Sequence, residues 1–151
     1  MVRTFCMSLT YEEKIPDVLA GICDSTLRPQ VGMSRGRKIG KRSKRQVGDQ
    51  LLLHGWKGVP YRSAWSFKVL AEIYKMMPAL ISYRGAVIRS DEGMINYQWE
   101  ELDWLAKIDG IRPATGLQMR NVFCRMYTPA HLEPGIWFDW IRFKLIKEAS
   151  P

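Results

Sequence analysis

The stretch IWFDWIRFKLIK, residues 136–147, has the clearest strand pattern in the chain. Four of its large apolar side chains fall at odd positions, namely Trp137, Ile141, Phe143 and Leu145. The basic residues Arg142 and Lys144 fall between them. Because successive side chains of a strand point to opposite faces, this period of two predicts a terminal strand with these four residues on one face and Arg142 and Lys144 on the other.

Shorter segments with strand or helix patterns precede this stretch. Strands are expected over residues 3–9, 24–28, 51–54 and 81–89, with one or two more within 62–76, where Pro78 ends the pattern. Helices are expected over 12–20, from 99 to the stop at Gly110, and over 115–127. Since strands and helices do not alternate regularly, we predict an α+β fold, a small mixed β-barrel with short flanking helices.

The length and composition predict a single domain over residues 1–151. The chain is 46% hydrophobic and 11% aromatic, with six Trp, which is enough to bury a core and to exclude disorder for most of its length. No apolar run approaches the roughly 18 residues that cross a bilayer. The first residues turn polar at Ser8 and acidic at Glu12, unlike a signal peptide. We therefore expect no membrane association and a cytoplasmic location.

The cysteines and histidines do not form a metal-binding pattern. Cys6, Cys23 and Cys124 are odd in number and far apart, so they predict reduced thiols rather than a disulfide framework or a zinc site. His54 and His131 are the only histidines. The sequence therefore predicts no metal and no cofactor.

The most uneven feature is a basic segment without any acidic residue. The chain has 23 basic and 15 acidic residues, a net charge of +8. Eight of the basic residues, enough to account for the whole excess, are Arg28, Arg35, Arg37, Lys38, Lys41, Arg42, Lys44 and Arg45. Such a cluster is typical of phosphate-binding surfaces, because each neutralised phosphate releases a counterion. We predict a flexible insertion over about 29–46; the alternative is a solvated loop that aids solubility.

A second group of aromatic and basic residues surrounds the turn at residues 58–60. It consists of Trp56, Lys57, Tyr61 and Arg62. Aromatic rings next to cations can stack a base while its phosphate is paired. We expect Lys57 and Arg62 to extend the basic surface, whereas for Trp56 alone the pattern favours a core residue that fills one end of the barrel over a base-stacking residue.

Three short motifs resemble an ASCH domain, a compact β-barrel of the PUA-like superfamily. They are Leu-Ala-Gly at 19–21, Thr-Leu-Arg at 26–28, and Val-Gly-Asp at 47–49 followed by an apolar strand that ends at Trp56. The segment ELDWLAKIDG, residues 101–110, is similar to the helix in the second half of that family. The resemblance extends from about Thr4 to Lys147 and implies one ASCH-type domain that binds RNA in preference to DNA.

The family signature G-x-K-x-x-E-x-R lines the cleft of these domains. Here Gly21 and Arg28 match it, whereas Cys23 replaces the Lys and Thr26 replaces the Glu. The resemblance therefore implies a cleft for a base or nucleotide, and we place in it Gly21, Thr26, Arg28, Trp56 and Tyr61. For Arg28 the alternative is a structural salt bridge to Asp24 or Asp49.

One branch of the family hydrolyses N4-acetylcytidine with a Lys, a Thr three residues later and a distant Glu. Thr26 matches that Thr, but Cys23 stands in place of the Lys. Thr26 and Cys23 are accordingly the candidate catalytic residues. Cys23 could be a nucleophile if the basic segment lowers its pKa, or a small buried side chain if it does not.

Three functions remain open at this stage. The first is a monomeric RNA-binding domain whose basic segment binds phosphates and whose cleft accepts a base. The second is a hydrolase that acts on RNA, as a ribonuclease, or on a modified nucleoside such as N4-acetylcytidine. The third is an interaction module whose basic segment docks onto an acidic protein. Whether the protein is an enzyme is undecided by the sequence.

Overall fold

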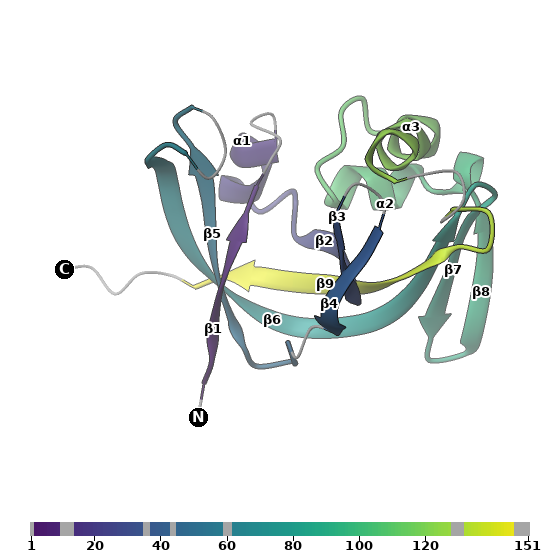
Figure 1. Cartoon of the computed structure of the whole chain (residues 1–151), viewed down its shortest axis with the longest axis horizontal. Helices are drawn as coiled ribbons and strands as arrows, with labels where there is room; N and C mark the ends of the chain where they lie inside the picture. Colours follow the sequence, from purple (N-terminus) through teal and green to yellow (C-terminus); the bar gives the residue numbers. More distant parts are fainter. Residues whose placement is uncertain are drawn as a thin grey trace.

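The computed structural model describes residues 2–9, 14–34, 37–42, 45–58, 62–127 and 132–146, and the side chains of these residues except 31–44. The fold is mixed α+β, as predicted, with mostly sheet and a few short helices (Figure 1). No helix in these ranges is long and apolar enough to span a membrane.

Two long strands form the centre of the main sheet. Strand β6 (Trp65–Ser82) pairs antiparallel with β9 (Ile136–Leu145), from Ala71 opposite Leu145 to Ile81 opposite Ile136. The first half of β6 also pairs with β5 (Gln50–Trp56), and its last four residues pair with β7 (Gly85–Ser90).

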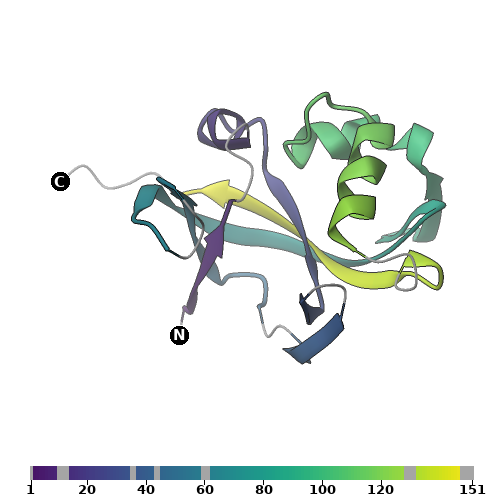
Figure 2. The same cartoon turned by 45° about the horizontal axis from the view of Figure 1, so that its top comes forward.

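The paired strands β6 and β9 are called the ribbon below, and the remaining strands of the main sheet lie on either side of it. Strand β1 (Thr4–Ser8) lies parallel to β5, β8 (Gly93–Gln98) is antiparallel to β7, and β2 (Ser25–Pro29) is antiparallel to β9. The helices are α1 (Lys14–Leu19), the 3-10 turn η1 (Trp99–Glu101), α2 (Asp103–Ile108) and α3 (Gly116–Met126). Figures 1 and 2 show β1 and β5 at one end of the ribbon and α2 and α3 at the other.

The β6–β9 ribbon supplies two separate hydrophobic cores. The α1 core contains the odd-numbered β9 residues Ile141 and Phe143 together with side chains of α1, β1 and β5. The α3 core contains the even-numbered residues Ile136, Phe138 and Trp140 together with side chains of α2, α3 and β7. Because odd and even positions of a strand face opposite sides, the two cores lie on opposite faces of the ribbon.

A β-bulge at Tyr74 lets β6 serve both cores. The register of β6 against β9 shifts between Ile73 and Lys75, so Tyr74 is an additional residue on β6. Ala71 and Ile73 before the bulge belong to the α1 core, whereas the equally odd-numbered Ala79 and Ile81 after it belong to the α3 core. The inserted residue exchanges the two faces of the strand.

The sheet is not closed into a barrel, which differs from the predicted architecture. A barrel turns one face of every strand toward one shared interior. Here the two ends of the ribbon bury opposite faces, so the sheet stays open. The same geometry explains Trp137, which was expected on the same face as Ile141 and Phe143 but, unlike them, is 44% exposed. Trp137 is on the same face of β9 as Ile141 and Phe143, the face that the α1 core covers further along the strand. At the Trp137 end of β9, the α3 core covers the opposite face.

Several predicted boundaries change. The break at Pro78 is absent, since Pro78 lies within β6 opposite Asp139. The single strand expected over 81–89 consists of the end of β6, a turn at Tyr83–Arg84 and β7, which begins at Gly85. The helix expected over 115–127 is confirmed, and the Thr115 hydroxyl accepts a hydrogen bond from the Gln118 amide at 3.1 Å.

The basic insertion contains a short hairpin that the sequence pattern did not predict. Strands β3 (Val31–Ser34) and β4 (Arg37–Arg42) pair antiparallel in a two-stranded sheet of their own. Its basic, glycine-containing sequence has few apolar residues, and the alternation of Val31 and Met33 with Gly32 and Ser34 is too short to indicate a strand. That the insertion is flexible without its ligand stays a prediction.

Gly116 provides a test of how α3 packs against η1. A Cβ atom at this position would overlap the carbonyl oxygen of Trp99. We expect Gly116→Ala to lower the free energy of unfolding by about 3 kcal/mol or more, measured by urea denaturation, because backbone must move to make room. Gly58→Ala is the matched control, since its Cβ would meet no atom closer than 3.5 Å. Equal stability of the two variants would contradict this packing.

Candidate functional site

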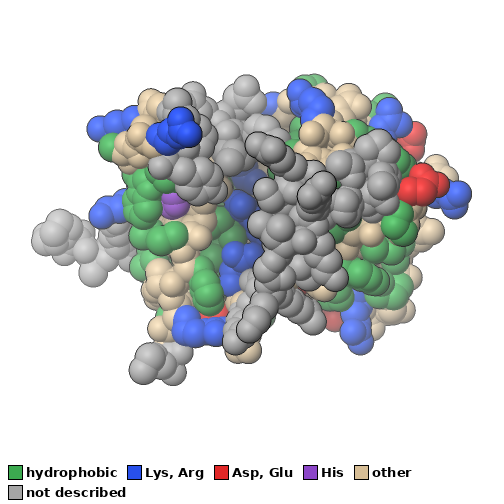
Figure 3. Space-filling model, in the orientation of Figure 1, with side chains coloured by type: hydrophobic (Ala, Val, Ile, Leu, Met, Phe, Trp, Pro, Cys, Tyr) green, Lys and Arg blue, Asp and Glu red, His purple; other side chains and the backbone are tan. Residues whose placement is uncertain are grey.

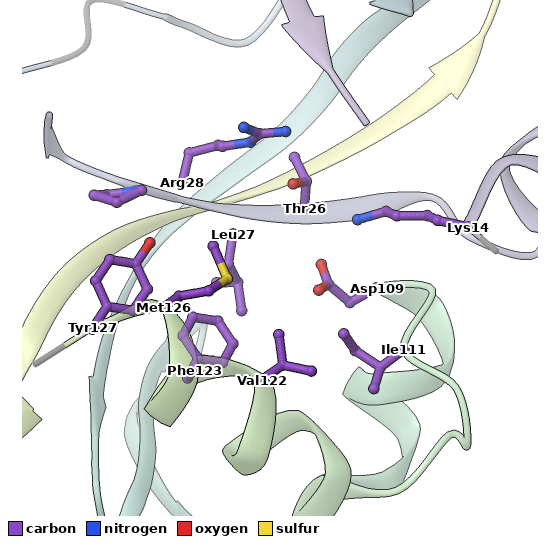
Figure 4. Close-up of a pocket in the computed structure, with 11 residues that line it drawn as sticks. Lys14, Thr26, Leu27, Arg28, Asp109, Ile111, Val122, Phe123, Met126 and Tyr127 are labelled. Carbon is purple, nitrogen blue, oxygen red and sulfur yellow. The ribbon is translucent and has the colours of Figure 1, made fainter. Parts of the chain in front are cut away.

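A small cavity lies between β2, α3 and the segment that follows α2. Its volume is about 90 Å³. Figure 4 shows the residues that line it, namely Lys14, Thr26, Leu27, Arg28, Pro29, Asp109, Ile111, Val122, Phe123, Met126 and Tyr127. One wall is therefore cationic and polar, and the other is apolar and aromatic.

Backbone pairing fixes the position of β2 at this cavity. Thr26 lies opposite Ile141 of β9, and Leu27 lies opposite Trp140. At the start of β2, the Asp24 amide donates a hydrogen bond to the Ile108 carbonyl at 3.0 Å, and the Asp24 carbonyl accepts one from the Phe143 amide at 2.9 Å. These bonds hold the end of α2, and with it Asp109, beside β2.

The two faces of β2 contribute different groups to the cavity. Leu27 belongs to the α3 core, on the same side as Asp109, Phe123 and Tyr127 (Figure 4). Thr26 and Arg28 rise on the opposite side of the strand, where Arg28 Nη2 donates a hydrogen bond to the Ser8 carbonyl at 2.9 Å. Thr26 is buried, and its hydroxyl makes no hydrogen bond within the described ranges.

Asp109 is a buried carboxyl group at the cavity. Burial raises its pKa to about 6, while the charges of Lys14 and Arg28 and the Ser25 hydroxyl oppose this rise. Its Oδ1 atom is buried without a hydrogen-bond partner among the residues that the structure describes. An unsatisfied buried acceptor is costly, and it is a group that a donor on a ligand could satisfy.

Lys14, the first residue of α1, is buried beside this carboxyl. In Figure 4 its amine lies near the level of β2, between Thr26 and Asp109. Gly110 makes room for the Lys14 stem, since a Cβ atom there would lie 2.6 Å from Lys14 Cγ and 3.0 Å from Cys23 Sγ. Gly110 also has φ +77°, which strains any other residue.

Cys23 is a core residue rather than a nucleophile. It is 1% exposed and belongs to the α1 core. Burial raises the pKa of its thiol to about 11, and the charge of Lys14 opposes this only in part. The thiol is therefore neutral near pH 7, contrary to the hypothesis that nearby cations activate it.

The predicted cleft residues do not all meet at one place. Thr26 and Arg28 line the cavity, whereas Gly21 lines a separate hollow with Asp24 and Tyr74. Trp56 contacts His54 and Trp65 at the far end of β5, and Tyr61 lies outside the described residues. The alternative of a salt bridge from Arg28 to Asp24 or Asp49 does not hold, because these carboxylates bind Arg142 and Arg3.

The predicted phosphate-binding residues are only partly visible. Arg45 is half-buried, and burial lowers its pKa, opposed by the charge of Asp139. Lys57 and Arg62 are exposed at the β5–β6 turn. The backbones of Arg37, Lys38, Lys41 and Arg42 are in β4, while Arg35 and Lys44 lie outside the described residues. On the face shown in Figure 3, Lys and Arg atoms lie in a hollow near the centre.

Sequence reasoning missed Lys14, Asp109 and the aromatic pair Phe123 and Tyr127 at the cavity. Asp109-Gly110 was interpreted only as the end of a helix, and Lys14 lies 95 residues earlier in the chain. Nothing in the local pattern links these positions, since their proximity depends on how β2 joins α1 to the end of α2. Within the described ranges, no three His, Cys, Asp or Glu side chains form a group that could hold a metal ion.

No family model matches the chain, and neither the curated proteins nor the solved structures contain a match to it.

Asp109 makes a pH-dependent contribution to stability that can be measured. In the unfolded chain its pKa has the ordinary value near 3.8, whereas in the folded protein it is about 6. Between these two pKa values the folded state binds more protons than the unfolded state. The contribution of Asp109 to stability is therefore present at low pH and is lost as the pH rises through about 6. We expect the stability of the wild type relative to Asp109→Asn to fall by about 2–3 kcal/mol between pH 4 and pH 7, measured by urea unfolding.

The groups that face Asp109 are Lys14 from α1 and Ser25 and Arg28 from β2, and they are unchanged in this comparison. Asp91→Asn, in an exposed turn, is the matched control and should show no such change. A stability difference for Asp109→Asn that is the same at both pH values would contradict the raised pKa.

Proposed function

We propose that this protein is an RNA-binding domain of ASCH type, related to the PUA-like barrels, that holds a base edge in the β2–α3 cavity and phosphates on the basic segment. The observation that carries the proposal is the position of the cavity. Thr26, Arg28 and Pro29 of β2 line it, and the basic segment with β3 and β4 follows directly after Pro29.

The size and chemistry of the cavity suit part of a nucleotide. At about 90 Å³ it is smaller than the roughly 300 Å³ of sites that enclose a whole small ligand. A planar base could enter by its edge between Phe123 and the β2 strand. Asp109 Oδ1 could then accept a hydrogen bond from an exocyclic amine, as carboxylates do with cytosine.

Charge complements this arrangement outside the cavity. The segment from Arg28 to Arg45 has eight cations and no acidic residue, so a polyanion would be attracted to the rim where the base enters. A base displaced from a single strand or loop is the usual target of sequence-reading RNA proteins, whereas bases of duplex DNA stay stacked. Together with the resemblance to ASCH domains, this favours RNA over DNA.

We also propose a monomer in the cytoplasm, in keeping with three free cysteines.

Binding of labelled single-stranded RNA across a potassium chloride series tests the basic segment. With four to six phosphate contacts, the logarithm of the affinity should fall against the logarithm of salt with a slope of about −3 to −5. Changing Lys38, Lys41 and Arg42 together to Gln should flatten the slope by about 2, because three contacts are lost.

The matched control removes the same charge elsewhere. Lys107, Arg120 and Arg125 are exposed on α2 and α3, and their change to Gln should leave the slope unaltered. Equal effects of both triple variants, or no binding to RNA at all, would overturn the proposal. Equal affinity for RNA, heparin and acidic peptides would instead support an interaction module.

A second candidate is a hydrolase that acts on a modified nucleoside such as N4-acetylcytidine. Two observations favour it: the Thr26 hydroxyl makes no hydrogen bond to a described residue, and the Lys14 amine lies near it. A hydroxyl can attack an acyl carbon while a neighbouring group takes its proton and passes it to the departing nitrogen, and water then releases the acyl group. It ranks second because Thr26 rises on the side of β2 opposite Asp109 (Figure 4). Lys14 is the amine that lies near Thr26 in Figure 4, and in this candidate it takes the role that the family's Lys would have at the position of Cys23.

Thr26 variants separate this candidate from simple binding. If the protein is a hydrolase, Thr26→Ala should reduce release of cytidine from N4-acetylcytidine by about 100-fold or more, while Thr26→Ser keeps part of the activity. Chromatography of the nucleosides measures the reaction, and RNA affinity should be the same in all three proteins. Absence of cytidine with the wild type, or undiminished release with Thr26→Ala, would eliminate this candidate.

A further inference from the structure

Three aromatic rings form a cluster at the end of β5 and the start of β6. The rings of His54 and Trp65 are stacked, with centroids 4.0 Å apart and an angle of 13° between their planes. Trp56 meets both rings edge-on, at 5.0 Å from His54 and 6.4 Å from Trp65. One face of the Trp65 ring is thus fixed against a buried histidine, and Trp65 as a whole remains 37% exposed.

A second β-bulge builds this cluster. The β5–β6 register shifts between His54, which lies opposite Lys68, and Trp56, which lies opposite Trp65. The additional residue on β6 brings Trp65 onto the face that His54 occupies. Gly55 permits the close approach, because a Cβ atom there would lie 2.6 Å from Ser66 Oγ and 2.8 Å from Phe67 Cε1.

The surroundings of the cluster are positively charged. From Gln50 to Ala71 the sequence contains no Asp or Glu, and its charged residues are Lys57, Arg62 and Lys68. All three are exposed, and none takes part in a salt bridge with a residue that the structure describes. This hairpin is therefore a second cationic region, separate in sequence from the basic segment.

Strand β1 connects the cluster to the β2–α3 cavity. Ser8 lies opposite His54 in the parallel β1–β5 pair, and the Leu9 amide donates a hydrogen bond to the His54 carbonyl at 2.8 Å. The Ser8 carbonyl accepts the hydrogen bond from Arg28, which lines the cavity. A polymer that places one base in the cavity could thus continue over β1 toward Trp65.

We propose that the exposed face of Trp65 stacks a second base of single-stranded RNA while Lys57, Arg62 and Lys68 contact the neighbouring phosphates. This inference rests on the proposed function, since it extends the path of the same polymer. A ring fixed on one face loses little freedom on binding, and every base offers a flat face, so the contact is tolerant of sequence.

The test compares two substitutions of similar size. Trp65→Leu removes the flat ring, whereas Trp65→Phe keeps one, and both can pack on His54. With fluorescein-labelled U10 RNA at fixed salt, Trp65→Leu should weaken binding by about tenfold, and Trp65→Phe by about threefold or less. The slope against salt should be unchanged in both, because stacking releases no counterions.

Trp137→Ala is the matched control, since Trp137 is also exposed but lies on β9 near β8, and it should bind as the wild type does. Equal affinity of wild type, Trp65→Leu and Trp65→Phe would overturn the inference and leave the proposed function standing. Absence of wild-type binding would overturn both. If Trp65→Leu lowers the melting temperature, loss of affinity in Trp65→Leu but not in the destabilised Gly116→Ala variant still supports the stacking contact.

Discussion

The β-bulge at Tyr74 is the constraint on which the rest of the structure depends. Without an additional residue in β6, the eighteen residues of this strand would present one face along their whole length. With the additional residue, the side chains of Ile73 and Ala79 are buried on opposite faces of the sheet, while both residues remain paired to β9. The chain thereby builds two cores on one ribbon instead of one core inside a closed barrel.

The candidate site lies where the ribbon changes from one core to the other. Strand β2 pairs with β9 at Ile141 and Trp140, which belong to different cores. Its side chains therefore reach both sides, with Thr26 and Arg28 toward β1 and Leu27 toward α3. Polar groups from one side and aromatic groups from the other meet only at such a junction, which explains why the cavity has two unlike walls.

Local sequence patterns predicted the individual strands and helices better than the way these pair and pack together. Alternation revealed the strand over 136–147 and helical spacing revealed α3, since each depends on neighbours within the element. Neither pattern shows a bulge, so the exposure of Trp137 and the open sheet could not be foreseen. Thr26 and Arg28 were found through a short motif, whereas Lys14 and Asp109 come from distant segments. The stack of His54 on Trp65 likewise depends on a register shift that leaves no mark in the sequence beyond Gly55.

The most direct test of the account is a map of backbone amide shifts in a 15N-labelled sample titrated with single-stranded RNA. If RNA binds at the junction of the two cores, the amides of Thr26, Arg28 and Gly110 should shift together with those of β4, while the amides of β8 at the opposite end of the sheet stay constant. Shifts confined to β7 and β8, or no shifts at RNA concentrations that saturate binding, would contradict the account.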